Sequence, residues 1–129
     1  STLQDGAAGG AAVTGESTEI STTTTIGADD SLLILTGEVY ATTALVDAAL
    51  EVGGSRAITT GGALDADDDL LVLWSDGSNS YLGIWDIGDT AASSTTIGTG
   101  KSSITTLVEL TGVDVSTSLT FTDANYDIF

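Results

Sequence analysis

The pattern of apolar and polar residues predicts several short strands. Residues 19–26 are rich in β-branched side chains, which strands favour. Residues 32–35 form a short continuous apolar run, and runs of this kind suit strands that are covered on both faces. Residues 104–110 and 119–121 complete the set of predicted strands.

The strongest local signal is a β-hairpin formed by residues 70–74 and 81–87. The segment between them carries Asp76-Gly77, a dipeptide that favours a tight bend between two strands. Because both strands carry apolar residues on both faces, we expect the hairpin to lie at the centre of a sheet, with a helix against one side.

One helix is predicted, at about residues 42–52. Thr42 or Thr43 can cap its start, apolar residues recur on one face, and Gly53-Gly54 ends it. Together these segments predict an α+β fold that consists of a mostly antiparallel β-sheet with one packed helix.

Two regions of different composition divide the chain. Residues 1–17 are small and glycine-rich, and we expect them to form a flexible linker or an edge segment. Residues 18–129 are expected to form a single β-rich domain. Within that domain, residues 28–35 resemble residues 66–73. Since such echoes are too few for a solenoid, we interpret this one as two strands that begin in a similar way.

The charge balance and the missing residue types exclude several classes of function. The 129 residues include 19 acidic and only 2 basic side chains, giving a formal net charge of −17. A chain this acidic repels nucleic-acid phosphates and anionic lipid surfaces, so we expect no binding to either. The apolar runs are far shorter than the ~20 residues of a membrane span, so we expect no membrane insertion. There is no Cys and no His. Zinc sites and Ser-His-Asp triads therefore lack their usual groups, and we do not expect an enzyme.

Calcium, which takes oxygen ligands alone, is the one cofactor that this composition favours. The acidic cluster 65–69 is the best candidate for a calcium site, although it does not match the EF-hand pattern, because Leu70 stands where that motif has Gly. The alternative to a calcium site is a solvated acidic turn that prevents a sheet edge from pairing with another chain. The candidate calcium ligands are Asp65, Asp67, Asp68, Asp69 and Asp76.

Three aromatic residues of the hairpin offer a further kind of site. Trp74, Tyr81 and Trp85 could together form a platform on which sugar rings stack. Aromatic side chains on a central hairpin are more often core residues. The platform would make the chain a carbohydrate-binding module, and both interpretations stay open at this point.

Three stretches resemble one group of proteins. Residues 69–86 combine an aliphatic strand, an Asp-Gly turn and a strand that begins with Tyr81; residues 107–113 read Leu-Val-Glu-Leu-Thr-Gly-Val; and residues 119–129 run from an amphipathic segment into an acidic and apolar ending. They are similar to the C-terminal region of bacterial proteins exported by the type I pathway, including RTX, surface-layer and adhesin proteins. The glycine-rich calcium repeats of that group are absent here.

The resemblance implies a non-catalytic C-terminal secretion and capping domain of an exported surface protein. Such a domain would be extracellular or on the bacterial cell surface, and its partners would be the upstream domains of the parent protein and the type I exporter. Its last strand would act as the export signal. The residues that would carry this signal are Asp123, Tyr126, Asp127, Ile128 and Phe129.

The main alternative is a self-assembling extracellular subunit of a filament or surface lattice. In that case residues 1–17 and the threonine-rich segment 22–25 would pair with a neighbouring copy by strand addition. Self-association is therefore a possible partner interaction, and a carbohydrate-binding module is the third interpretation.

Overall fold

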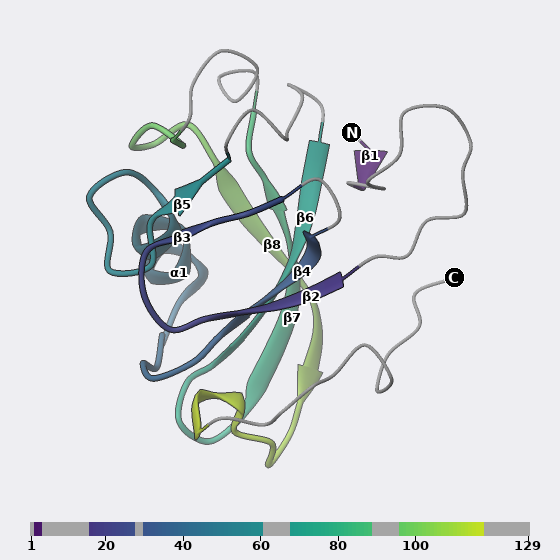
Figure 1. The fold of residues 1–129 in the computed structure, drawn as a ribbon. Coiled ribbons are helices and arrows are strands. Elements are labelled where there is room, and N and C mark those ends of the chain that lie inside the picture. The colour runs from purple at the N-terminus through teal and green to yellow at the C-terminus, as the bar shows by residue number, and fades with distance from the viewer. Residues whose placement is uncertain (1, 4–15, 28–29, 61–67, 89–95, 118–129) are drawn as a thin grey trace.

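A computed structural model of the protein describes residues 2–3, 16–27, 30–60, 68–88 and 96–117 (Figure 1). Strands dominate, with one α-helix and one short 3-10 helix among the described residues. In chain order the elements are β1 (Thr2–Leu3), β2 (Glu16–Ile20), β3 (Thr24–Thr25), β4 (Asp30–Leu35), α1 (Thr43–Leu50), β5 (Ile58–Thr59), β6 (Asp68–Ser75), β7 (Ser80–Asp86), β8 (Ser103–Leu110) and η2 (Val115–Thr117).

The main sheet is mixed, with the strand order β2-β4-β6-β7-β8. Strands β2, β4 and β6 run parallel to one another, whereas β6-β7 and β7-β8 are antiparallel pairs. Strand β1 pairs in parallel with the first residues of β6. The predicted mostly-β α+β fold with one helix is confirmed, but the prediction of a mostly antiparallel sheet was wrong. Apolar runs that are buried on both faces, such as Leu32–Leu35, are typical of parallel strands.

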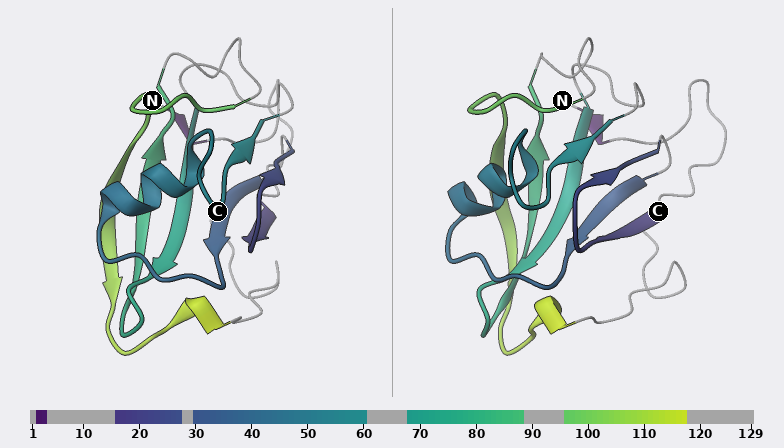
Figure 2. Two further views of the ribbon diagram at one scale, coloured as in Figure 1. Left: turned by 90° about the vertical axis from the view of Figure 1, so that its left-hand side faces the viewer. Right: turned by 60° about the vertical axis from the view of Figure 1, so that its left-hand side comes forward.

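The two connections between parallel strands cover the same face of this sheet. In the chain, β3 belongs to the connection from β2 to β4 and β5 to the connection from β4 to β6. The two strands pair with each other in parallel. Helix α1 belongs to the second connection and lies across the sheet on that side (Figure 2). This face therefore carries a covering layer made of one helix and a small two-stranded sheet.

The larger core fills the space between that layer and the sheet. It joins inward-facing residues of β4, β6 and β7 to residues of the connections and of α1, and burial of this kind is the main stabilising contribution in a small domain. Its buried members are Ile20, Ile26, Leu33, Leu35, Tyr40, Val46, Ala49, Leu50, Ile58, Leu70, Val72, Trp74, Trp85, Ile87 and Ile97.

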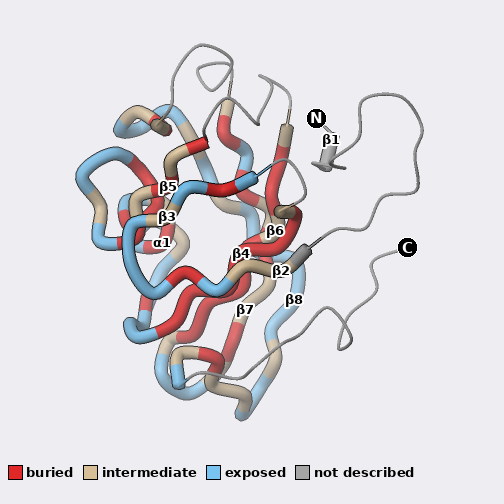
Figure 3. Tube along the Cα trace, in the orientation of Figure 1, coloured by how far each residue is buried: buried red, intermediate tan, exposed pale blue. Residues whose placement is uncertain are grey.

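A smaller apolar cluster lies on the opposite face. Leu32 and Ile34 of β4 and Leu73 of β6 pack there against Val115 of η2. Because successive side chains of a strand point to opposite faces, β4 contributes to both clusters, as predicted for the continuous apolar run. Buried positions concentrate in β4 and β6, whereas β8 is mostly exposed (Figure 3).

The predicted helix and hairpin both form. Helix α1 occupies Thr43–Leu50, within the predicted range 42–52, and the Thr42 side chain accepts a hydrogen bond from the Leu45 amide. Strands β6 and β7 pair from Asp69–Asp86 to Ser75–Ser80, and Gly77 takes the positive φ of 97° that the bend requires. The hairpin lies inside the sheet, between β4 and β8.

The ends of the main sheet are β2 and β8. Among the described residues β2 pairs only with β4 and β8 only with β7. Of the predicted linker or edge segment 1–17, the described residues belong to β1 and to the first part of β2. The strand predicted at 104–110 is confirmed as β8, and the strand predicted at 119–121 lies outside the described residues.

The difference between core and edge gives a direct test. Replacing Leu33 by Ala removes a fully buried side chain from β4 and should lower the free energy of unfolding by about 2–5 kcal/mol. The same change at Leu107 of β8, which is 50% exposed, should cost less than about 1 kcal/mol. Urea unfolding of both variants measures the two losses, and equal losses would contradict the assignment of β4 to the core.

Candidate functional site

The chain is anchored to the sheet just before its last twelve residues. Val115 of η2 is fully buried in the smaller cluster, and its amide donates to Ser80 Oγ at 3.0 Å. Ser80 Oγ in turn donates to the Val113 carbonyl at 2.6 Å, while the Gly37 amide donates to the Ser116 carbonyl at 2.9 Å. In Figure 1, η2 lies beside the lower end of the sheet. The described part of the chain is therefore attached to the sheet as far as η2.

The predicted export residues themselves, Asp123, Tyr126, Asp127, Ile128 and Phe129, lie outside the described residues. Sequence reasoning did not identify the anchor that precedes them. Its signal was the apolar pair Val113 and Val115, separated by one residue and placed after a glycine turn.

Among the candidate calcium ligands that the structure describes, Asp76 lies apart from Asp68 and Asp69. Asp65 and Asp67 lie outside the described residues, and Asp68 and Asp69 are the first two residues of β6. Asp76 follows the last residue of the same strand, so roughly 23 Å of extended chain separates it from Asp69. Asp76 therefore cannot share one ion with Asp68 and Asp69.

Asp76 instead organises the hairpin turn. Its Oδ1 accepts hydrogen bonds from the amides of Ser78 and Asn79, each at 2.8 Å, and its Oδ2 accepts one from the Tyr81 hydroxyl at 2.8 Å. The Asn79 and Ser78 amides, followed by the Tyr81 hydroxyl, lower the pKa of the Asp76 carboxyl. The same contact with Asp76 raises the pKa of Tyr81.

Among the described residues, Asp69 is the buried carboxylate that has an unpaired oxygen. Its side chain is only 5% exposed, and its Oδ1 is buried without a hydrogen-bond partner. Directly opposite it in the β6-β7 ladder stands Asp86, which is exposed and accepts a hydrogen bond from the Gly88 amide at 2.9 Å. Sequence reasoning included Asp69 among the candidate ligands but did not identify Asp86 as its neighbour, because the pairing depends on the strand register.

The aromatic residues form core contacts and leave no flat tryptophan surface for a sugar ring. Trp85 is fully buried and Trp74 is 2% exposed, with the Trp74 ring stacked on Tyr81 at a centroid separation of 5.6 Å. The Trp85 Nε1 group donates to Asp47 Oδ1 of α1 at 2.9 Å, which ties the helix to the sheet. Ser102 Oγ donates to the same oxygen at 2.6 Å.

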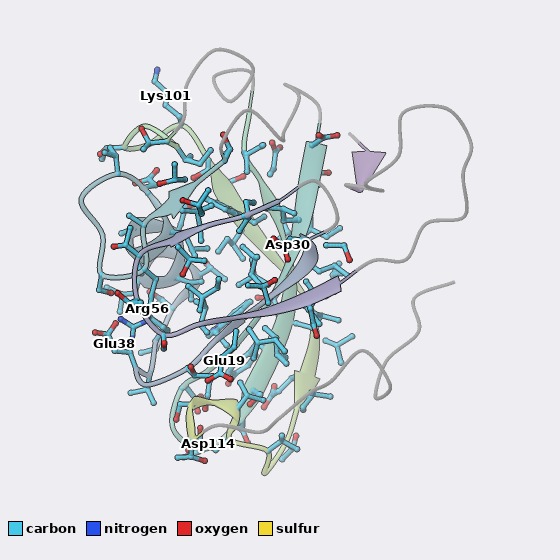
Figure 4. The ribbon with its side chains drawn as sticks, viewed as in Figure 1. Glu19, Asp30, Glu38, Arg56, Lys101 and Asp114 are labelled. Atoms are coloured by element: carbon cyan, nitrogen blue, oxygen red, sulfur yellow. The ribbon has the colours of Figure 1, made fainter. Side chains whose placement is uncertain are left out.

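Neither of the two basic residues forms an ion pair with Asp69 or Asp86. Arg56 is buried, and its Nη2 donates a hydrogen bond to the Thr36 carbonyl at 2.9 Å. Its Nη1 lies 3.8 Å from Glu38 Oε1. Hydrogen bonds from Ser55 and then from Tyr40 lower the pKa of the Glu38 carboxyl. Lys101 is exposed and its side chain extends outward, whereas Arg56 and Glu38 lie side by side (Figure 4).

Neither a cluster of metal ligands nor a membrane-spanning helix occurs among the described residues. Within the part of the chain that the structure describes, no three acidic, His or Cys side chains converge as a metal site. No helix there has both the length and the apolar character that crossing a membrane requires. Comparison with protein-family models, curated proteins and solved structures found no match to this chain.

The turn around Asp76 predicts a specific pH dependence. Because the pKa of Asp76 is lowered in the folded state, its contribution to stability is complete above the unfolded pKa and is lost as pH falls through the folded one. Asp76→Asn should therefore melt at a lower temperature than the parent at pH 7, and this difference should shrink below about pH 4. Thermal melts from pH 7 to pH 2 measure it.

Glu109→Gln is the matched control for this experiment, since it removes one exposed carboxylate from β8. A difference between Asp76→Asn and the parent that stays constant across the whole pH range would contradict the role of the Asp76 carboxylate.

Proposed function

We propose that this chain is a non-catalytic secretion and capping domain from the C-terminal region of an exported bacterial surface protein. Residues 119–129 carry the export signal, and the folded part caps the upstream domains of the parent outside the cell. The proposal rests first on the resemblance of residues 69–86, 107–113 and 119–129 to proteins of the type I pathway.

The observation that best supports it is the way the domain leads into the predicted signal. Residues 69–86 form the β6-β7 hairpin, and β8 pairs with β7 and continues into the turn that buries Val115. Two of the three stretches are therefore neighbours in one sheet, and the third begins after the anchor formed by Val115 and Ser80. In the unfolded chain this anchor does not exist, so the terminal segment is available to an exporter before folding.

High negative charge agrees with this order of events. Only 2 basic residues balance 19 acidic ones, and a chain with strong self-repulsion collapses poorly before export. Folding outside the cell would then bury the larger core and fix the anchor at η2.

Deletion of residues 123–129 tests the export signal. Residues 1–129 would be fused behind a reporter in a bacterium that carries a type I exporter, and reporter activity would be compared between medium and cells. We expect the deletion to abolish export without reducing synthesis, because the exporter reads this segment. Removal of residues 4–10, which has the same length, should leave export unchanged. Full secretion of the fusion that lacks residues 123–129 would exclude the signal.

A second candidate function, a self-assembling extracellular subunit, is favoured by the exposed edge of the sheet. Strand β8 is eight residues long, and its Leu107 and Val108 are 50% and 46% exposed. Glu109 is its one charged residue. Natural edge strands often carry several charges or a proline that prevent pairing with another chain, and β8 lacks a proline as well.

Replacing Leu107 by Lys tests this second candidate. If copies pair through β8, purified protein should form ordered assemblies by electron microscopy and light scattering, and Leu107→Lys should abolish them. Val39→Lys is the control, because Val39 is equally exposed, at 54%, but lies outside the strands. A monodisperse monomer at every concentration tested would count against assembly.

A further inference from the structure

The beginning of β6 contains a buried carboxylate that the described residues do not satisfy. Asp69 is 5% exposed, and its Oδ1 has no hydrogen-bond partner. Leaving a charged group buried without a partner is costly, and such groups are normally paired or bound to a metal. The feature therefore needs a physical explanation.

Of the other buried charged residues, Arg56 also has one unpaired buried atom, its Nε, whereas Glu51 has none. Glu51 is equally buried, and its Oε1 accepts a hydrogen bond from the Gly100 amide at 2.5 Å. Arg56 donates to the Thr36 carbonyl and lies near Glu38. Among the described residues, Asp69 is the one buried carboxylate that has an unsatisfied oxygen.

A second carboxylate stands directly opposite the first. Asp86 of β7 is the register partner of Asp69, and directly opposed residues of an antiparallel pair have Cβ atoms about 4.5–5.5 Å apart on the same face. Like charges in this position destabilise the ladder. Asp86 Oδ1 accepts a hydrogen bond from the Gly88 amide, and the same oxygen can accept one more contact.

The neighbouring residues make this pair a favourable place for a cation. Along β6 and β7, Leu71 and Ile84 are opposed two residues further on, on the same face of the sheet as the two carboxylates. Both are partly buried, so the environment is less polar than bulk water and the attraction between carboxylate and cation is stronger. Arg56 and Lys101, the two bases of the chain, do not form ion pairs with either carboxylate.

We propose that Asp69 and Asp86 form a calcium-binding site that joins β6 to β7 at this end of the sheet. Calcium takes oxygen ligands at about 2.3–2.6 Å, so one ion can bridge two carboxylates at this separation. Water and backbone carbonyls would fill its other positions. The site differs from the set predicted from the sequence, because it includes Asp86 and excludes Asp76. It is independent of the export role.

Calcium titration of residues 1–129 tests the site. The protein would be stripped with a chelator, and ionic strength would be held constant with NaCl so that general screening of the negative charge does not change. We expect saturable binding of CaCl₂ by calorimetry, and a melting temperature that rises with calcium concentration, because calcium binds the folded state preferentially.

Two substitutions and a matched control locate the ion. Asp69→Asn and Asp86→Asn should each weaken calcium binding by at least about tenfold, since each removes one charged ligand. Glu109→Gln removes the same charge from a distant part of the sheet and should leave the affinity within about twofold. Without calcium, Asp69→Asn should melt at or above the temperature of the parent, because it removes an unpartnered buried charge.

Three results would overturn the proposal. One is a parent protein whose melting temperature does not respond to calcium at constant ionic strength. Another is unchanged calcium affinity in Asp86→Asn, whose exposed side chain makes it the variant least at risk of misfolding. The third is a loss in Glu109→Gln equal to that in the two aspartate variants, which would indicate diffuse attraction to the whole acidic surface.

Discussion

The fold depends on one constraint: the parallel strands β4 and β6 are apolar on both faces and must be covered on both. Every residue from Ser31 to Leu35 is buried, so no face of β4 can be left to solvent. The two connections between parallel strands cover one face, with β3, β5 and α1 packed over the larger core. The other face is completed where η2 brings Val115 against Leu32, Ile34 and Leu73. The anchor before the terminal segment is thus a requirement of the core.

A second constraint is the shortage of positive charge. With 2 bases for 19 acids, most carboxylates have no basic side chain to pair with, and several of the described ones accept hydrogen bonds from N–H or O–H groups instead. Asp76 is satisfied by the amides and hydroxyl of its own turn, Asp47 by Trp85 and Ser102, and Asp114 by Ser116. These bonds also fix the hairpin and attach the helix to the sheet. Asp69 differs from these residues, because its buried Oδ1 has no hydrogen-bond donor.

Local patterns in the sequence predicted the local elements. The Asp76-Gly77 bend, the helix capped by Thr42 and the doubly buried run of β4 all depend on residues close in the chain. The direction of each strand does not depend on residues close in the chain, because it is set by how the connections cross the sheet. Trp85 and Asp47 are 38 residues apart, so no local pattern could reveal their hydrogen bond.

The echo between residues 28–35 and 66–73 shows the same limit. The described parts of the two segments lie in β4 and β6, which are neighbouring parallel strands. Leu33 pairs with Val72, whereas the sequence similarity would align it with Leu71. A shift of one residue moves every side chain to the other face. Residues that correspond in the two segments therefore face opposite sides of the sheet. The register of β4 against β6 is set by three-dimensional packing and not by the sequence similarity.

The net charge of the chain and the Asp69–Asp86 pair act over different distances. At physiological ionic strength the Debye length is about 8 Å, so salt screens the repulsion between exposed charges that lie further apart than this. The two opposed carboxylates are closer than this, and one is buried where salt screens poorly. Simple salt can therefore weaken the repulsion among the exposed acidic residues, but it does not remove the repulsion between Asp69 and Asp86. A bound divalent cation would act on the local repulsion directly, by holding β6 and β7 together where β1 also pairs.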